Sequence, residues 1–318
     1  MTDKVAAYIA QHQLLDFSSP IIVGVSGGAD SICLLNILKA LGYDCIAAHC
    51  NFELRGDESD RDEHFVQAFC QQTSIPLHCR HFDTKQYAAR HKLSIEMAAR
   101  ELRYRWFEEL RQKTNAQAIA VAHHQDDSIE TCLLNLLRGT GIQGMTGIHP
   151  KNGHLVRPLL ALSRTDIEQY LTDNGLQYIT DSTNLQNDYT RNKIRNRLIP
   201  LMEEINPQFR QTMVANMESF AATSHLYRDT VDRAKSKALQ NNGLINLPEV
   251  KAFIEPKTLL FDILQPYGFH PAEINKILQG TTGNRYIGRN AVLTLIRQGK
   301  EIWGKLGPLR TNETECLG

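Results

Sequence analysis

The sequence predicts an α/β protein with a doubly wound, mostly parallel sheet, followed by a helical linker and a small C-terminal α+β domain. In the first half of the chain, short apolar runs rich in β-branched residues alternate with segments of helical period. Strands that alternate with helices are joined by crossovers, and these cover both faces of a parallel sheet. The short runs are apolar throughout, as expected of strands that are buried on both faces.

The elements of the first half follow one another in a regular order. The expected strands are Ile21–Val25, Cys45–Cys50, Leu77–Phe82 and Ala118–Ala122. The helices expected after the first three are Asp30–Leu41, Asp57–Gln72 and Ser94–Lys113, the last of which is opened by Ser94 as an N-cap. After the fourth strand, apolar residues recur at the spacing of one buried helical face, namely Ile129, Cys132, Leu133, Leu136 and Leu137.

The second half of the chain changes character near residue 205. Before this point we expect a helix at Thr165–Asp173, a strand at Gln177–Ile179 and a basic helix from Thr190 to Pro200. After it, a long polar helix runs over about Gln208–Gln240. We therefore predict a first domain over residues 1–205, a helical linker over 206–240 and a small domain over 241–318.

Composition excludes few function classes. Lys plus Arg equals Asp plus Glu, 35 each, so the net charge gives no sign of a nucleic-acid partner. No apolar run approaches the roughly 18 residues of a membrane span, and the N-terminus lacks a secretion signal, so no membrane is expected. The seven cysteines are scattered, with no C-x-x-C pair. They predict buried, reduced thiols and a cytoplasmic protein.

A glycine-rich loop, Ser26-Gly27-Gly28-Ala29-Asp30-Ser31, joins the first strand to its helix. Unpaired backbone N–H groups and the helix dipole favour an anion at such a helix N-terminus. The two glycines permit close approach, and the two serines add hydroxyl donors. The Gly-Lys-Ser/Thr ending of a Walker A loop is absent. The loop predicts a phosphate-binding site, and the alternative is a glycine turn without a ligand.

The acidic residue of this loop, Asp30, would repel a phosphate unless a Mg²⁺ ion lies between them. A second glycine segment, Gly139–Gly144, matches the dinucleotide pattern G-x-G-x-x-G. That fingerprint has to follow a strand and open a helix, whereas this one follows a predicted helix. We therefore interpret Gly139–Gly144 as a helix-ending loop.

A second polar cluster, His123–Thr131, lies where the fourth strand meets its helix. The carboxyl ends of parallel strands share one crevice, so this cluster and the Ser26 loop should face each other. Asp127 and Glu130 are neighbours on one helical face. Such carboxylates hold Mg²⁺ or accept an amine, and the histidines can donate to a phosphate. The alternative is that Asp126 or Asp127 only caps the helix.

Taken together, these motifs resemble the N-type ATP pyrophosphatases of the PP-loop superfamily and, more narrowly, the tRNA(Ile)-lysidine synthetase family. The resemblance implies a Rossmann-like fold for the first domain. It covers about residues 20–200 and is carried by Val25–Ser31, His49–Phe52 with Leu54-Arg55, Ala99–Tyr104, His123–Asp127 with Glu130-Thr131, Arg138–Gly147, Arg157–Leu160, Asp181–Asn184 and Tyr189–Arg195.

The resemblance implies a carbon–nitrogen ligase that attaches L-lysine to C2 of the wobble cytidine of an isoleucine tRNA with a CAU anticodon. ATP would first adenylylate the C2 oxygen with release of pyrophosphate, and the lysine ε-amine would then displace AMP. The implied catalytic residues are Asp30, His123, Asp127 and Arg100, with Mg²⁺ held by Asp30 and Asp127. Ser26, Gly27, Gly28, Ala29, Asp30 and Ser31 would bind ATP phosphates, and Glu130 would bind the lysine amine.

Contacts to tRNA are expected from local clusters of cations. Arg191, Lys193 and Arg195 lie in a segment without acids, and the alternative is a solvated helix face. Arg103, like Arg100, would steady a phosphate or nucleobase, or would instead form surface ion pairs with Glu96 or Glu101. The segment Thr282–Ile287 resembles the first C-terminal domain of the family, which helps to hold tRNA. Many family members form a homodimer.

Two other functions remain open from the sequence. The first is another PP-loop tRNA-modifying enzyme, a cytidine thiolase, which is expected to need a cysteine pair or iron–sulfur ligands. The second is a non-catalytic nucleotide- or RNA-binding module, which would need the phosphate loop but not the polar cluster His123–Thr131 beside it.

Overall fold

The structure is a computed structural model that describes residues 1–180 and 189–309. The chain forms two compact units, Met1–Ala221 and Ala222–Gly318, and each is considered by itself. The quoted motif Asp181–Asn184 lies outside the described residues. Within the described part of the chain, no helix is both long and apolar enough to span a membrane.

The first unit is built on a six-stranded sheet with strand order β3-β2-β1-β4-β6-β5. Neighbouring strands from β3 to β6 run parallel, and β5 runs antiparallel to β6. The predicted doubly wound, mostly parallel sheet is therefore confirmed. Its strands are β1 (Ile21–Gly24), β2 (Cys45–Asn51), β3 (Leu77–His81), β4 (Ala118–Ala120), β5 (Lys151–Asn152) and β6 (Leu155–Val156).

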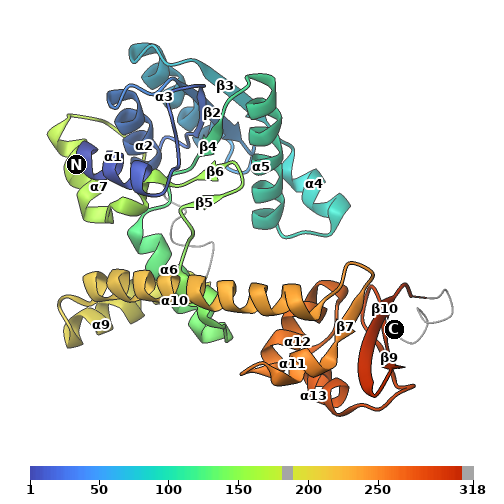
Figure 1. The fold of residues 1–318 in the computed structure, drawn as a ribbon. Coiled ribbons are helices and arrows are strands. Elements are labelled where there is room, and N and C mark those ends of the chain that lie inside the picture. The colour runs from blue at the N-terminus through green and yellow to red at the C-terminus, as the bar shows by residue number, and fades with distance from the viewer. Residues whose placement is uncertain (181–188, 310–318) are drawn as a thin grey trace. The chain divides into compact units, whose positions relative to one another are not determined.

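Successive residues of the central strands point to opposite faces, and each face has its own core. Ile21 and Val23 pack with the helices of one face, whereas Ile22 packs with Trp106 and Phe107 of α5 on the other. Figure 1 shows α2 and α7 on one side of this sheet and α5 on the other. Gly24 permits the close approach of α5, since a Cβ there would lie 2.9 Å from the Phe107 ring.

Most helices of the first unit follow the strands as the sequence predicts. They are α1 (Thr2–Gln11), α2 (Ala29–Ala40), α3 (Asp57–Gln72), α4 (Thr84–His91), α5 (Ile95–Lys113), α6 (Gln125–Arg138), α7 (Arg164–Asp173), α8 (Tyr189–Lys193) and α9 (Ile199–Ile205), with short turns η1 (Ile142–Thr146) and η2 (Pro158–Ala161). The predicted Ser94 cap is confirmed, because its side chain accepts from the Met97 N–H. Helices α1 and α4 and the β5–β6 hairpin were not predicted.

Several predicted details were wrong. The strand expected at Gln177–Ile179 is a single parallel bridge between Ile179 and Gly28. Leu136 and Leu137 are 55% and 64% exposed, because α6 buries only its earlier turns and its last turn leads into the exposed glycine loop. The basic helix does not stop at Pro200. A π-helical segment, η4 (Ile194–Leu198), links α8 to α9, whose first turn accepts the proline.

Four of the six cysteines in the described residues follow the prediction, and Cys50 is half-buried. Cys33, Cys45, Cys70 and Cys132 are buried free thiols, whereas Cys79 on edge strand β3 is exposed. An edge strand has a neighbour on one side only, which leaves part of its surface open.

The second unit is a small α+β fold, as predicted. Its antiparallel sheet has strand order β7-β10-β9-β8, and helices pack on it around Leu260, Ile263 and Leu293. Helix α10 (Phe209–Ala238) contains the division between the units. The other elements are β7 (Leu244–Asn246), α11 (Leu247–Ala252), α12 (Pro256–Leu264), η5 (Gln265–Tyr267), α13 (Pro271–Gln279), β8 (Arg285–Ile287), β9 (Val292–Gln298) and β10 (Glu301–Gly307).

Candidate active site

The Ser26–Ser31 loop leaves the end of β1 and opens α2, with Gly28 as the helix N-cap. Ser31 is the hub of the loop. Its Oγ accepts from the Ser26 N–H at 3.2 Å and donates to the Gly28 carbonyl at 2.9 Å. The two serine hydroxyls lie 3.2 Å apart. The two hydroxyls can therefore bind a ligand only if these contacts rearrange. The backbone N–H groups of the first turn of α2 can bind one without rearrangement.

Gly27 has a φ of +90°, which side-chain-bearing residues rarely adopt. A Cβ at Gly27 would also lie 2.9 Å from Cδ1 of Ile179. The Ile179 N–H donates to the Gly27 carbonyl at 2.9 Å, so the chain after α7 holds the loop in place. Glycine is needed here for two separate reasons, the backbone torsion and the closeness of Ile179.

Asp30, on the first turn of α2, is paired with Arg164, which was not among the predicted site residues. Nη1 of Arg164 lies 2.7 Å from Oδ1 of Asp30. Burial raises the pKa of Asp30 and the charge of Asp127 adds to this, whereas His124 and Arg164 oppose it. Arg164 is the first residue of α7, directly after the Ser163 cap, so the start of that helix aims its guanidinium at the loop.

The Ser26–Ser31 loop and the polar cluster His123–Thr131 lie close together, as predicted, and His124 is the residue between them. Nε2 of this buried histidine lies 3.8 Å from Oδ2 of Asp30 and 3.5 Å from Oδ2 of Asp127. Asp127 also accepts from the His124 N–H at 3.1 Å and so caps α6. Loop and cluster therefore share one crevice at the carboxyl ends of β1 and β4.

Asp126 has a different environment from Asp127. Its Oδ2 accepts from the Arg164 N–H at 2.8 Å, and its Oδ1 is paired with Arg210 of α10. Asp126 is buried and links α6, α7 and α10 within the first unit. Of the two neighbouring carboxylates, Asp127 is the one that faces the phosphate loop.

His123 lies in a pocket of positive charge. Burial lowers its pKa to about 4, and the charges of Arg157 and Arg100 act in the same direction against that of Asp127. Its buried Nδ1 has no hydrogen-bond partner within the described residues. His123 is therefore neutral at pH 7, with a ring nitrogen left for a ligand. Arg157 is itself buried, and its Nη1 donates to the His149 carbonyl at 2.6 Å.

Glu130 is 1% exposed and is bound by a guanidinium from the basic segment. Nε and Nη2 of Arg195 lie 2.6 and 3.0 Å from its two oxygens. Nε of Arg191 lies 3.9 Å from Glu130, and Nη2 of Arg195 lies 3.7 Å from Asp127. The inner side of this segment therefore faces the polar cluster, whereas Lys193 is exposed.

Arg100 and Arg103 stack on aromatic rings of the first unit. The Arg100 guanidinium lies 4.9 Å from the centre of Tyr104, and that of Arg103 lies 5.3 Å from the centre of Phe52. Glu101 binds Tyr87 and Arg105 instead. The two side chains are thus held beside the crevice by ring contacts.

Two carboxylates that meet at one nitrogen are suited to Mg²⁺, which binds through one or two carboxylates together with phosphate oxygens and water. Asp30 and Asp127 are the two carboxylates of the crevice that would hold such an ion. In residues 1–180 and 189–309, no group of three or more His, Cys, Asp or Glu side chains has the arrangement of a metal site.

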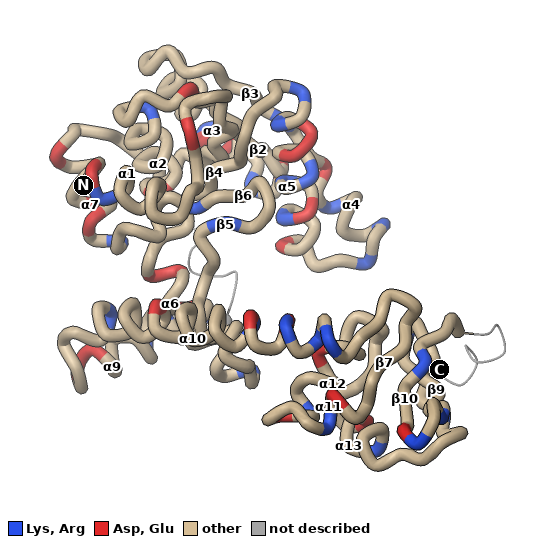
Figure 2. Tube along the Cα trace, in the orientation of Figure 1, with Lys and Arg blue, Asp and Glu red and all other residues tan. Residues whose placement is uncertain are grey.

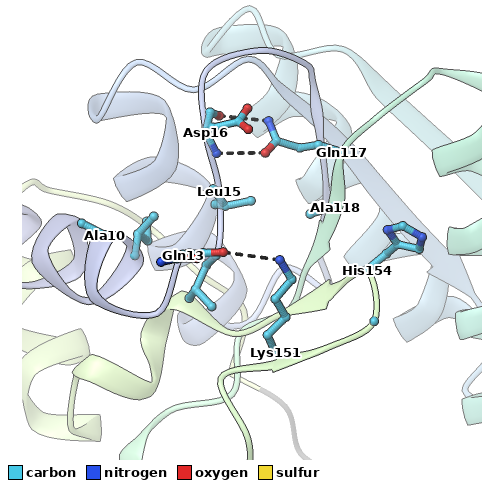
Figure 3. A pocket seen from close by; sticks show the side chains of 11 residues that line it. Ala10, Gln13, Leu15, Asp16, Gln117, Ala118, Lys151 and His154 are labelled. Atoms are coloured by element: carbon cyan, nitrogen blue, oxygen red, sulfur yellow. Dashed lines mark hydrogen bonds between the residues drawn. The ribbon is translucent and has the colours of Figure 1, made fainter.

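A cavity of about 460 Å³ lies away from this site. It is bordered by Ala118, the first residue of β4, whereas His123 follows the opposite end of that strand. Figure 3 shows that the Gln117 amide is engaged with the Asp16 backbone and that Lys151 donates to Gln13. These polar groups tie the segment after α1 to the sheet, and the cavity has no part in the phosphate site.

Comparisons with known proteins identify the family of this chain. Residues 1–202 match the PP-loop domain family, and residues 239–289 match the TilS substrate binding domain family. The chain is 49% identical over 269 residues to the tRNA(Ile)-lysidine synthase of Parabacteroides distasonis, and 46% identical over 292 residues to that of Bacteroides thetaiotaomicron. These matches cover 85% and 90% of this chain but 61% and 68% of the relatives.

A solved structure with the same fold is the U34-tRNA thiolase NcsA of Methanococcus maripaludis, with a TM-score of 0.56 and 18% identity. The likeness covers 69% of this chain and 76% of that one, and at this identity it concerns the fold alone. The family match to most of the first unit and the identity to curated relatives are the stronger findings. The chain belongs to the PP-loop family and, within it, to the tRNA(Ile)-lysidine synthase family.

Proposed function

We propose that this protein uses ATP to attach L-lysine to C2 of the wobble cytidine of an isoleucine tRNA with a CAU anticodon. The observation that carries the proposal is the convergence of Asp30 and Asp127 on His124, with buried Glu130 one helical turn further along α6. A phosphate loop, a metal-binding pair of carboxylates and an acid suited to an amine thus lie on adjoining elements.

In the first step, the C2 oxygen of cytidine attacks the α-phosphorus of ATP and pyrophosphate leaves. The amides at the start of α2 bind the pyrophosphate group, as at other helix N-termini. Mg²⁺, held by Asp30 and Asp127, would supply charge to the phosphate oxygens. Arg100 and Arg157 act on the neutral His123, and these three side chains would stabilise the negative charge that gathers on the transferred phosphate in the transition state.

In the second step, the ε-amine of lysine attacks C2 and AMP leaves. Glu130 is the acid best placed to bind the incoming ammonium group. Its carboxylate is engaged by Arg195 at 2.6 and 3.0 Å, so the ammonium has to share or replace that guanidinium. A carboxylate beside the amine can also take up the proton that has to leave before the nitrogen attacks.

The RNA would be held by Arg103 and by the cations of the basic segment, Arg191, Lys193 and Arg195, together with the second unit, residues 241–318. The second unit carries the match to the substrate binding domain family. An RNA substrate and free thiols fit the cytoplasm. A homodimer is also proposed, and light scattering on the purified chain tests it.

Incubation with ATP, radiolabelled lysine and tRNA tests the function. We expect label in the RNA that depends on ATP and on the CAU anticodon. Sulfur transfer to the RNA in place of lysine would favour a thiolase, and RNA binding without ATP cleavage would favour a non-catalytic module.

A further inference from the structure

A second cavity, of about 230 Å³, opens on the edge strand β3 and helix α4. It is bordered by Arg80, His81 and Phe82 from the end of β3, by Asp83, Gln86, Tyr87 and Arg90 from α4 and its cap, and by Leu102 from α5. The strands run parallel, so the cavity lies on the same sheet edge as the phosphate loop. The size suits a single planar ring system rather than a larger ligand.

Most charged side chains that border this cavity are already paired, including His81, which lies 3.3 and 2.9 Å from Glu53 and Glu63. The carboxylate of Asp83 is used by the helix, because it accepts from the Gln86 N–H at 2.9 Å. Arg80 is paired with Glu109 at 2.6 Å. Arg90, at the end of α4, is exposed and forms no ion pair within the described residues. Figure 2 shows cations gathered at this end of α4.

The aromatic side of the cavity is held rigid. The Tyr87 hydroxyl donates to Glu101 at 2.7 Å, and the Arg105 guanidinium lies 5.3 Å from the centre of the Tyr87 ring. His91 packs on the same ring, with centroids 4.2 Å apart. Arg105 and His91 thus already pack on the ring of Tyr87, and what this side chain offers a ligand is a fixed wall of the cavity beside the guanidinium of Arg90.

Cations connect this cavity to the catalytic crevice along one face of α5. Leu102 borders the cavity, the neighbouring Arg103 lies over Phe52 beyond the end of β2, and Arg100 acts on His123 beyond β4. The cations thus follow the strand ends from β3 to β4. Such a row suits the backbone of a single strand whose reacting base lies in the crevice.

We propose that the cavity between β3, α4 and α5 binds one unstacked nucleotide of the RNA substrate, a neighbour of the base that reacts. Tyr87 and the planar guanidinium of Arg90 contact the base, and Arg90 also supplies charge for the backbone. The inference rests on the proposed function for the identity of the RNA. The pocket itself is tested by RNA binding, without any measurement of catalysis.

The test uses the full chain and an anticodon stem-loop RNA with the sequence CAU, with affinity measured by fluorescence anisotropy over a range of salt. A series of RNAs carries one abasic residue at each loop position in turn. The wild type should lose about tenfold in affinity at one position beside the reactive cytidine. Arg90→Ala should bind the intact RNA about tenfold more weakly and lose the response to that abasic residue.

Arg90→Lys separates the two roles of this side chain. It keeps the charge but loses the planar guanidinium. It should restore the salt slope, which Arg90→Ala lowers by about one, without restoring the response to the abasic residue. Lys113→Ala is the matched control, because Lys113 is an exposed cation at the other end of α5. It should leave affinity and slope unchanged.

Two results would overturn the pocket, namely equal affinities for Arg90→Ala and Lys113→Ala, or no abasic position that weakens wild-type binding. The lysine-labelling assay judges the proposed function separately. If the RNA gains no labelled lysine but the Arg90 effects persist, the proposed ligase activity is wrong and the nucleotide pocket is supported. If the RNA is labelled but the Arg90 variants bind like wild type, only the proposed nucleotide pocket is wrong.

Discussion

Asparagine substitutions at Asp126 and Asp127 should have opposite consequences, although the two residues are adjacent and the chemical change is the same. In Asp127→Asn the amide oxygen can still accept from the His124 N–H, and Asn caps helices about as well as Asp. The loss of partly buried contacts to His124 and Arg195 at 3.5 and 3.7 Å should change stability by only about 1 kcal/mol.

The activity of Asp127→Asn should fall much further. The substitution removes one of two charges proposed to hold Mg²⁺ at the phosphates, and a loss of this kind costs about 10²- to 10³-fold in rate. In wild type, one oxygen of Asp126 accepts from the Arg164 N–H and the other pairs with Arg210. In Asp126→Asn, the side-chain NH₂ group replaces one of these oxygens and therefore faces another donor. This should lower stability by about 2 kcal/mol, with AMP formation by the folded fraction within about tenfold of wild type.

The assays are AMP formation from radiolabelled ATP, in the presence of lysine and tRNA, and urea unfolding of each variant. Asp127→Asn that turns over within tenfold of wild type would remove Asp127 from the mechanism. A fully stable but inactive Asp126→Asn would show that the assignment of roles to the two carboxylates is reversed.

Three further predictions concern the loop, the histidine and the buried ion pair. Gly27→Ala should weaken ATP binding at least tenfold, measured by calorimetry, because a Cβ meets Ile179 and the φ of +90° is strained. His123 is neutral when folded, so stability should fall as the pH drops from about 6.5 to about 4, by at most about 3 kcal/mol, and His123→Asn should flatten this dependence in urea unfolding. Arg195→Ala leaves the buried Glu130 without its main partner and should cost about 2 kcal/mol, less than a fully buried pair because Arg195 is 40% exposed, whereas Arg197→Ala should cost little.

Features that depend on neighbouring residues could be predicted from the sequence. The phosphate loop is one, because a strand, two glycines and a helix start occur within a few residues. Asp127 and Glu130 are another, because their spacing places them on one face of α6. The alternation of strands and helices likewise predicted the parallel sheet. Because parallel strands end at the same edge of a sheet, it also predicted that the phosphate loop and the polar cluster lie close together.

Features that depend on distant segments could not be predicted. Arg164 and Asp30 are 134 residues apart in the chain, and no local pattern links them. The same holds for Arg157, whose charge acts on His123, and for Arg195 on Glu130, which the sequence suggested only as a tRNA contact. Helix α4 was missed because its eight residues are short and mostly polar, with no periodic apolar face.

The strand expected at Gln177–Ile179 failed for a related reason. Its residues suit a strand, but within the described residues its backbone pairs with the loop at Gly27 and Gly28 and with no strand. Pairing across space, rather than local preference, decided its structure.

In the proposed mechanism, ATP activates the RNA by transfer of its adenylyl group before lysine reacts. The direct measurement uses ATP labelled at the α-phosphorus together with a CAU-anticodon tRNA, first without lysine and then with it. We expect labelled, adenylylated tRNA in the first stage and release of labelled AMP when lysine is added. Labelled ADP as the product, or tRNA that never carries the label, would contradict it.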